Sequence, residues 1–149
     1  LLGNGGSAAT ASHLACDLAK STAAPDRPRL RCTALTDNVP LITAWANDVS
    51  YEVVFSEQLI NLVRPGDVVV GISGSGNSPN VLAAMRVARE HGATTVGLTG
   101  YQGGKLKGLV DYCVVVPSDS MQQIEDAHLV IGHAIFVQLR DGPSPTAAE

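Results

Sequence analysis

Two short turns rich in glycine and serine constrain this chain more than any other feature. One spans residues 3–7, Gly-Asn-Gly-Gly-Ser, and the other spans residues 71–80, Gly-Ile-Ser-Gly-Ser-Gly-Asn-Ser-Pro-Asn. Each follows an apolar run and precedes a segment of helical periodicity, so each is expected to join a strand to a helix. Such turns direct backbone N–H groups and hydroxyls toward an anion. Two of them at one edge of a parallel sheet therefore predict a phosphorylated ligand.

The remaining pattern alternates strands and helices along the chain. We expect strands at residues 1–3, 30–35, 68–72, 94–98 and 112–116, and helices at 7–20, 38–46, 51–63, 78–91 and 121–139. This order predicts an α/β fold, a five-stranded parallel sheet flanked by helices. The apolar run 1–2 is short for a buried strand, so we expect an N-terminal segment to be missing from the sequence. Residues 1–141 are predicted to form a single domain and 142–149 a C-terminal tail.

Composition excludes several classes of partner. The 149 residues carry a net charge of −4 at pH 7, and no cluster of Lys and Arg offers a footprint for nucleic acid. No apolar run approaches the ~20 residues that cross a bilayer, which argues against a membrane partner. Three cysteines without a C-x-x-C pair are typical of reduced thiols in a cytoplasmic protein.

The two turns match neither of the common nucleotide motifs. Residues 3–8 lack the third glycine of G-x-G-x-x-G, and the chain contains no Gly-Lys-Ser/Thr of the Walker A type. What distinguishes them is their hydroxyl content, from Ser7, Ser73, Ser75 and Ser78. Serines at helix N-termini suit a phosphate monoester without a lysine or Mg²⁺. The alternative is a pair of ordinary strand-to-helix turns that need glycine only for the backbone.

His13 and Asp17 form the first candidate group for chemistry. Their i,i+4 spacing places them on one face of the predicted helix 7–20. This spacing suits two ligands of one divalent ion or an acid–base pair, and also a solvated pair without function. Asp37 directly follows a predicted strand, so we expect it to face the ligand.

The last predicted helix carries the second candidate group, Glu125, Asp126, His128 and His133. Polar groups in a largely apolar helix must find partners, which makes a buried site plausible. Glu125 and His133 lie about 12 Å apart along a continuous helix. They therefore cannot both bind one ion directly unless the helix bends or another subunit contributes. His128 is equally consistent with a hydrogen-bonded core histidine.

Together these residues resemble the SIS (sugar isomerase) fold, a three-layer flavodoxin-like or Rossmann-like architecture, and more narrowly the phosphoheptose isomerase group. The matching stretches are residues 3–7 with His13, 46–48, 64–67, 72–81, 97–100, and the last helix with His128 and His133. The resemblance implies a homotetramer with sites between subunits. It also implies conversion of sedoheptulose 7-phosphate to D-glycero-D-manno-heptose 7-phosphate by acid–base enediol chemistry.

The resemblance further implies roles for individual residues. The serines of the two turns would hold the phosphate, and zinc would be bound by His13, Asp17, Glu125 and His133. Asp17 and His133 would carry out the acid–base catalysis. The full expected substrate-binding set is Asn4, Gly5, Ser7, Asp37, Ser73, Gly74, Ser75, Ser78 and Glu125.

The chain departs from the family pattern at several of these positions. The differences are Asp17 for a usual Glu, Glu125 for Gln, Gln122 for Asp, Ser21 for Arg, and Gly74 for Thr. An added carboxylate strengthens divalent-ion binding, while the shorter acid and the absent Arg leave the substrate open. Two alternatives therefore stand beside the isomerase: a non-catalytic module that binds a phosphosugar or a protein as a regulator, and an isomerase of another sugar phosphate. The joint presence of His13, Asp17 and His133 favours an enzyme.

Overall fold

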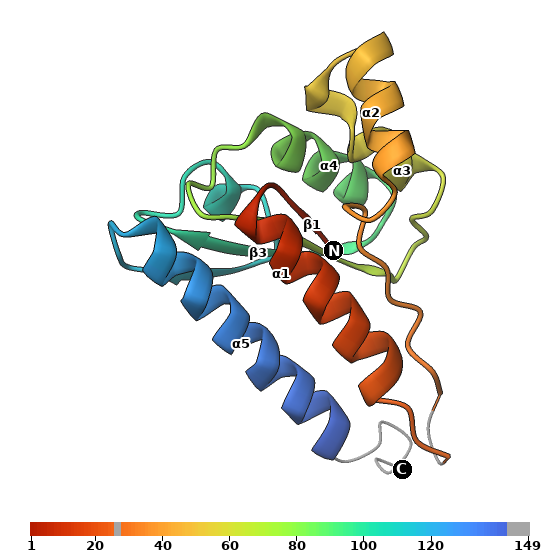
Figure 1. The fold of residues 1–149 in the computed structure, drawn as a ribbon, viewed down its shortest axis with the longest axis vertical. Coiled ribbons are helices and arrows are strands. Elements are labelled where there is room, and N and C mark those ends of the chain that lie inside the picture. The colour runs from red at the N-terminus through yellow and green to blue at the C-terminus, as the bar shows by residue number, and fades with distance from the viewer. Residues whose placement is uncertain (26–27, 143–149) are drawn as a thin grey trace.

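The computed structural model describes residues 1–25 and 28–142 and confirms an α/β fold built on a parallel sheet. Its strands are β1 (Leu2–Gly3), β2 (Val68–Ser73), β3 (Thr94–Gly100) and β4 (Tyr112–Val116), side by side in that order (Figure 1). Gly3 pairs with Ile72, and Gly71 pairs with Gly97. The parallel register brings the carboxyl ends of β1 and β2 together. The two glycine-serine turns therefore begin side by side, as the sequence predicts.

Helices cover both faces of the sheet (Figure 1). On one face α1 (Gly6–Cys16) lies beside α5 (Met121–Asp141), and α1 continues into a π-helical turn, η1 (Asp17–Ser21). On the other face α4 (Pro79–Glu90) packs on β2 and β3. Against α4 lie the 3₁₀ turn η2 (Tyr51–Val53) and α3 (Ser56–Ile60), with α2 (Val39–Asp48) packed on η2. A second 3₁₀ turn, η3 (Leu106–Gly108), precedes β4.

Local signals explain where several helices begin and end. The Asn38 side chain caps α2, because its Oδ1 accepts the Leu41 N–H at 3.1 Å. Pro79, which needs no N–H partner, occupies the first position of α4. Gly92 follows α4 with a φ of +75°, the left-handed conformation that commonly ends a helix.

The core consists of two apolar clusters, one on each face of the sheet. The larger faces α4 and includes Leu2, Phe55, Leu59, Val81, Met85 and Leu106. The smaller faces α1 and includes Ala11, Leu14, Ala15, Ile72 and Leu98. Small side chains on α1 allow that helix to approach the sheet closely. Within the described ranges, no helix combines the length and apolar character needed to span a bilayer.

The predicted strand at 30–35 is wrong, so the described residues form four strands rather than five. This segment does lie beside β1: the Leu35 N–H donates to the Leu1 carbonyl at 2.9 Å, and the Leu1 backbone nitrogen donates to the Thr33 carbonyl at 2.8 Å. These two bonds do not continue as a strand ladder, because the chain then turns, with the Asp37 N–H donating to the Ala34 carbonyl at 3.4 Å. The predicted helix 51–63 is divided between η2 and α3. Of the predicted tail, residues 143–149 lie outside the described part of the chain.

Candidate functional site

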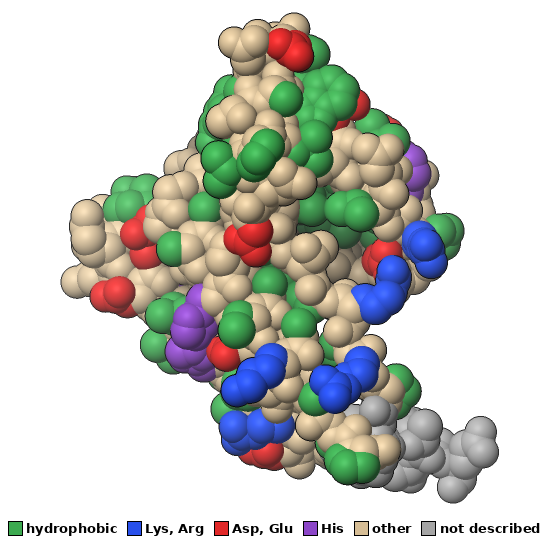
Figure 2. All heavy atoms as spheres, turned by 45° about the vertical axis from the view of Figure 1, so that its right-hand side comes forward, with side chains coloured by type: hydrophobic (Ala, Val, Ile, Leu, Met, Phe, Trp, Pro, Cys, Tyr) green, Lys and Arg blue, Asp and Glu red, His purple; other side chains and the backbone are tan. Residues whose placement is uncertain are grey.

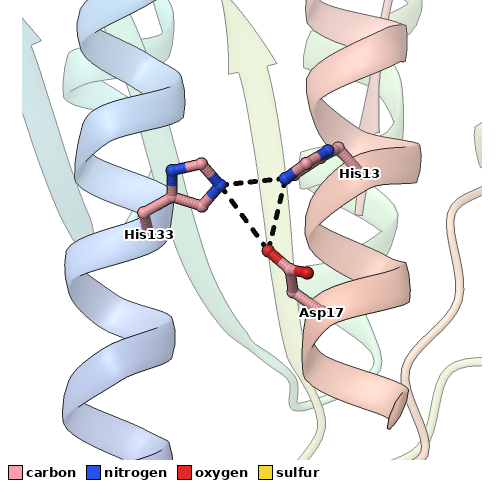
Figure 3. A group of neighbouring side chains, drawn as sticks. All are labelled: His13, Asp17 and His133. Atoms are coloured by element: carbon pink, nitrogen blue, oxygen red, sulfur yellow. Dashed lines mark hydrogen bonds and ion pairs between the residues drawn. The ribbon is translucent and has the colours of Figure 1, made fainter. Parts of the chain in front are cut away.

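Three side chains from the two ends of the chain meet between α1 and α5 (Figure 3). The Nε2 atoms of His13 and His133 lie 2.9 Å apart. The Asp17 Oδ2 atom lies 3.3 Å from the His13 nitrogen and 3.6 Å from the His133 nitrogen. The two imidazoles expose about half of their side chains and Asp17 about a quarter, and Figure 2 shows histidine side chains at the surface beside a carboxylate. A small molecule can therefore reach this triad, His13, Asp17 and His133.

Close packing of the two helices brings the triad together. Gly132 of α5 is buried against Leu14 of α1, and these residues directly precede and follow His133 and His13 in sequence. A Cβ atom at Gly132 would lie 2.6 Å from Leu14 Cδ1, so any larger residue would force Leu14 or one of the helices to shift. The contact fixes the distance between the two imidazoles. Neither helix alone could form the site.

The donor set of the triad fits a divalent zinc ion. Two imidazole nitrogens and one carboxylate oxygen, all within 4.8 Å of one another, are a ligand combination found in catalytic zinc sites. With Zn–N bonds of about 2.1 Å, tetrahedral ligand atoms lie about 3.4 Å apart, and the observed separations of 2.9, 3.3 and 3.6 Å bracket that value. Three protein ligands would leave a fourth position open for a substrate oxygen.

Glu125, the fourth expected ligand, lies outside the triad. Its carboxyl group is placed over the beginning of α1, where a Cβ at Gly6 would lie 2.5 Å from the Glu125 Cδ atom. The first turns of α5 thus cover the glycine-serine turns, with Met121 against Gly74 in the same way. A carboxylate beside a helix N-terminus is electrostatically favourable. Glu125 is therefore positioned at the first turn rather than between the histidines.

The serines of the two turns gather where the strands end. Ser7 is buried in the first turn of α1, and Gly5 before it has a φ of +57° that favours glycine. Among the described residues no side chain caps α1, so the first N–H groups of this helix are left without a side-chain cap. In the second turn the hydroxyls of Ser73 and Ser78 lie 3.0 Å apart. Uncapped amides and adjacent hydroxyls suit an anion with several acceptor oxygens.

Ser75 and Gly74 complete the second turn. The Ser75 hydroxyl accepts the Asn77 N–H at 3.2 Å, and the Gly74 carbonyl accepts the Gly100 N–H at 2.8 Å. Gly76 has a φ of +65°, and a side chain there would overlap the Gly103 carbonyl. The turn is thus braced by the loop that follows β3.

Asp37 is exposed and held by hydroxyl groups from two segments. The Ser12 hydroxyl of α1 donates to Asp37 Oδ1, and the Thr36 hydroxyl donates to the same oxygen at 3.3 Å. Ser12 and Thr36 also lie within hydrogen-bond distance of each other, at 3.0 Å. Ser12 directly precedes His13, so Asp37 is brought to the side of α1 near the triad. Sequence reasoning selected Asp37 and missed Ser12, because a serine within a helix carries no signal of its own.

His128 is a core histidine rather than part of the triad. Its side chain is fully buried, and its Nε2 donates to the Thr99 carbonyl at 3.1 Å. Burial lowers the pKa of His128 below its usual value, so the ring is neutral at pH 7. The Nδ1 atom has no hydrogen-bond partner among the described residues. The remaining departures from the family pattern, Ser21 in η1 and the exposed Gln122, also lie outside the triad.

Two residues near the turns were not identified from the sequence, Asn80 and Tyr51. Asn80, at the second position of α4, exchanges two hydrogen bonds with Asn4, and the Tyr51 hydroxyl donates to Asn4 at 3.0 Å. The sequence offers little signal for this contact, because Asn80 is the second residue of a helix whose N-cap is Ser78.

Comparisons with known proteins agree with this arrangement. Residues 1–100 match the family model of the SIS domain. The chain is 47% identical to the phosphoheptose isomerase of Paramagnetospirillum magneticum over 143 residues, 96% of this chain and 74% of that protein. It is 46% identical to the phosphoheptose isomerase of Akkermansia muciniphila over 133 residues, 89% of this chain and 70% of that protein.

Comparison with solved structures also finds phosphoheptose isomerases. The phosphoheptose isomerase from Neisseria gonorrhoeae superimposes with a TM-score of 0.86 at 36% identity, covering 94% of this chain and 75% of that one. The enzyme from Francisella tularensis gives a TM-score of 0.87 at 32% identity with the same coverage. Sequence identity, matching topology and the convergence of His13, Asp17 and His133 lead to one conclusion: this chain belongs to the phosphoheptose isomerase family of SIS-domain proteins.

Proposed function

We propose that this protein converts sedoheptulose 7-phosphate to D-glycero-D-manno-heptose 7-phosphate. The observation that carries the proposal is the triad, in which His133 of α5 meets His13 and Asp17 at an accessible position. His13 and Asp17 follow the first glycine-serine turn on α1 and its continuation η1. Relatives that cover most of this chain are named phosphoheptose isomerases. A module that only binds a phosphosugar needs the serines but gains nothing from the triad.

The distance between the two parts of the site supports a long sugar phosphate. Ser7 and His13 are six residues apart on α1, which corresponds to about 9 Å along a helix. A phosphate bound by Ser7, Ser73, Ser75 and Ser78 would therefore lie well away from the reacting carbons at the triad. An extended seven-carbon chain fits such a separation. Asp37 and Glu125 would then contact hydroxyls between the two ends.

The reaction requires only proton transfers. In the ketose, one group, Asp17 or His133, takes a proton from C1. The C1–H electron pair forms the C1–C2 double bond while the C2–O2 π pair moves onto O2, which takes up a proton to give a cis-enediol. Return of a proton to C2, with loss of the O1 proton as the C1–O1 double bond forms, yields the aldose. A zinc ion held by His13, Asp17 and His133 would polarise the substrate's carbonyl and hydroxyl oxygens. Substrate binding at the turns keeps C1 and C2 beside these groups during both transfers.

The assembly and location of the enzyme form part of the same proposal. Val130, Ile135 and Val137 of α5 are large apolar side chains that remain exposed, Val130 by 67%. A second copy packed on this helix would bury them, in agreement with a homotetramer whose sites lie between subunits. A phosphorylated substrate and three free cysteines support a cytoplasmic location.

Isomerisation of sedoheptulose 7-phosphate tests the proposal directly. We expect turnover that falls after chelation and returns when Zn²⁺ is added. Phosphosugar binding without turnover in any metal condition would instead support the regulatory module. Turnover of a different sugar phosphate in preference to sedoheptulose 7-phosphate would keep the isomerase and replace the substrate.

A further inference from the structure

A pair of asparagines connects the two glycine-serine turns. Asn4 directly follows β1, and Asn80 is the second residue of α4. The Asn4 Nδ2 donates to Asn80 Oδ1 at 2.8 Å, and the Asn80 Nδ2 donates to Asn4 Oδ1 at 2.9 Å. These two bonds close a ring between the amide groups. Asn80 is only 2% exposed and Asn4 is half-buried, so the pair is partly shielded from competing water.

Further bonds use most of the remaining hydrogen-bonding capacity of the pair. Asn80 Oδ1 also accepts the Val81 N–H at 2.9 Å, and Asn4 Oδ1 also accepts the Tyr51 hydroxyl at 3.0 Å. An amide oxygen has two lone pairs, so both oxygens are fully used. The Asn4 Oδ1 atom therefore has no lone pair left for a substrate hydroxyl. The Asn4 side chain connects the two turns, and the ring uses one of its two Nδ2 hydrogens.

The sheet pairing covers only the first residues of the two turns. The pairing of β1 with β2 ends at Gly3 and Ile72. Beyond that point the chain enters the two turns, in which Ser7 and Ser78 belong to separate strand–helix units. A single phosphate that contacts both serines needs the two turns at a fixed separation, and small errors in such positions are costly.

We propose that Asn80 and Tyr51 are positioning residues that act through Asn4 to fix this separation. The amide pair holds the start of α4 against the end of β1, and Tyr51 anchors the pair from η2. The inference rests on the proposed function in that it takes the two turns as the phosphate site. It gives Asn4 a role in the support of the phosphate site.

A double-mutant cycle tests the amide pair, with inorganic phosphate as the probe. Asn4→Ala and Asn80→Ala should each weaken phosphate binding about tenfold, because each removes both bonds of the ring. The double variant should be no weaker than either single variant, since the two residues act as one unit. Asn61→Ala, at the exposed end of α3, is the matched control and should bind as the wild type does.

Tyr51→Phe provides a second test that leaves the fold intact. Tyr51 is 55% exposed, so removing its hydroxyl deletes one hydrogen bond and no core packing. The KM for sedoheptulose 7-phosphate and the Kd for phosphate should rise about threefold with kcat unchanged, the pattern of lost substrate anchoring. Thermal unfolding should stay at the wild-type temperature. Tyr112→Phe, on the exposed edge strand, is the control.

Two results would overturn the inference. Additive losses in the cycle would mean that Asn4 contacts the phosphate itself. Wild-type phosphate binding in folded Asn80→Ala and Tyr51→Phe would mean that the two turns need no connection. The phosphate measurements do not depend on the sugar, so they test the positioning role even if sedoheptulose 7-phosphate is not isomerised.

Discussion

Gly132 sets the distance between the side chains of the triad. Replacing Gly132 with alanine should lower the activity much more than the stability of the folded protein. The added Cβ would lie 2.6 Å from Leu14 Cδ1 and 3.0 Å from Leu14 Cγ. Carbon atoms in good contact lie about 3.5–4.0 Å apart, so α1 and α5 must separate by about 1 Å or Leu14 must leave its position. Leu14 is 4% exposed within a packed cluster, which leaves it little room to move.

The expected costs differ for folding and for catalysis. Overpacking destabilises a core by about 1–3 kcal/mol, while alanine gains about 1 kcal/mol over glycine inside a helix. The net loss of stability for Gly132→Ala is therefore about 0–2 kcal/mol. In contrast, His13 and His133 adjoin the contact, and a displacement of about 1 Å at a reacting group can cost about 100-fold in rate. We expect kcat/KM to fall about 100-fold in a protein that remains folded.

Steady-state kinetics and thermal unfolding measure the two effects in the same variant. Gly108→Ala is the matched control, since a Cβ at that position meets no atom within 4 Å. Adding Leu14→Ala to Gly132→Ala removes every Leu14 atom of the clash and should restore part of the activity. Wild-type kcat/KM in Gly132→Ala would refute the reasoning, because the helix spacing would then not control the triad.

Four further outcomes follow from the site. His133→Gln should abolish turnover without unfolding the protein, measured by kinetics and circular dichroism; a variant at the wild-type rate would remove His133 from the mechanism. Because burial lowers the pKa of folded His128 below its usual 6.5, the unfolded chain binds the proton first as the pH falls. Stability should then decrease below pH 6.5 by up to about 1.4 kcal/mol per pH unit, and denaturant titrations of His128→Gln should lack this component. Ser12→Ala should raise KM several-fold by releasing Asp37, whereas an unchanged KM would leave Asp37 without a role in binding. Glu125→Gln should have a Zn²⁺ affinity within about twofold of the wild type, measured by competition titration, since Glu125 lies over Gly6. A large loss of affinity would make Glu125 a zinc ligand.

Much of the fold and part of the site could be predicted from the sequence. Val68–Val70 and the glycine-serine turn after them identified β2 and the start of α4, because buried parallel strands are continuous apolar runs. The i,i+4 spacing of His13 and Asp17 placed them on one face of a helix, where the structure has them. That His13 and Asp17 meet His133 was expected only from the resemblance to a family. The spacing of residues within one helix does not show which other helix packs against it.

The rest depended on contacts that local sequence does not encode. Residues 30–35 have the composition of a strand, but in the described structure their backbone bonds to Leu1 do not extend into a ladder, and the chain turns at Ala34. Glu125 and His133 share a helix, yet the continuous α5 carries them to different ends of the site. The bonds from Asn80 and Tyr51 to Asn4 join residues more than 40 positions apart. Such partners follow from packing and not from periodicity.

The triad joins the first helix to the last, with His13 and His133 separated by 120 positions. Any ion bound there acts as a reversible cross-link around most of the chain, and it binds the folded state in preference to the unfolded one. Its free concentration should therefore set the melting temperature, adding about 2.7 kcal/mol of stability at 100 times its Kd. The melting temperature would then report how much of this site is occupied, even in samples whose catalytic rate cannot be measured.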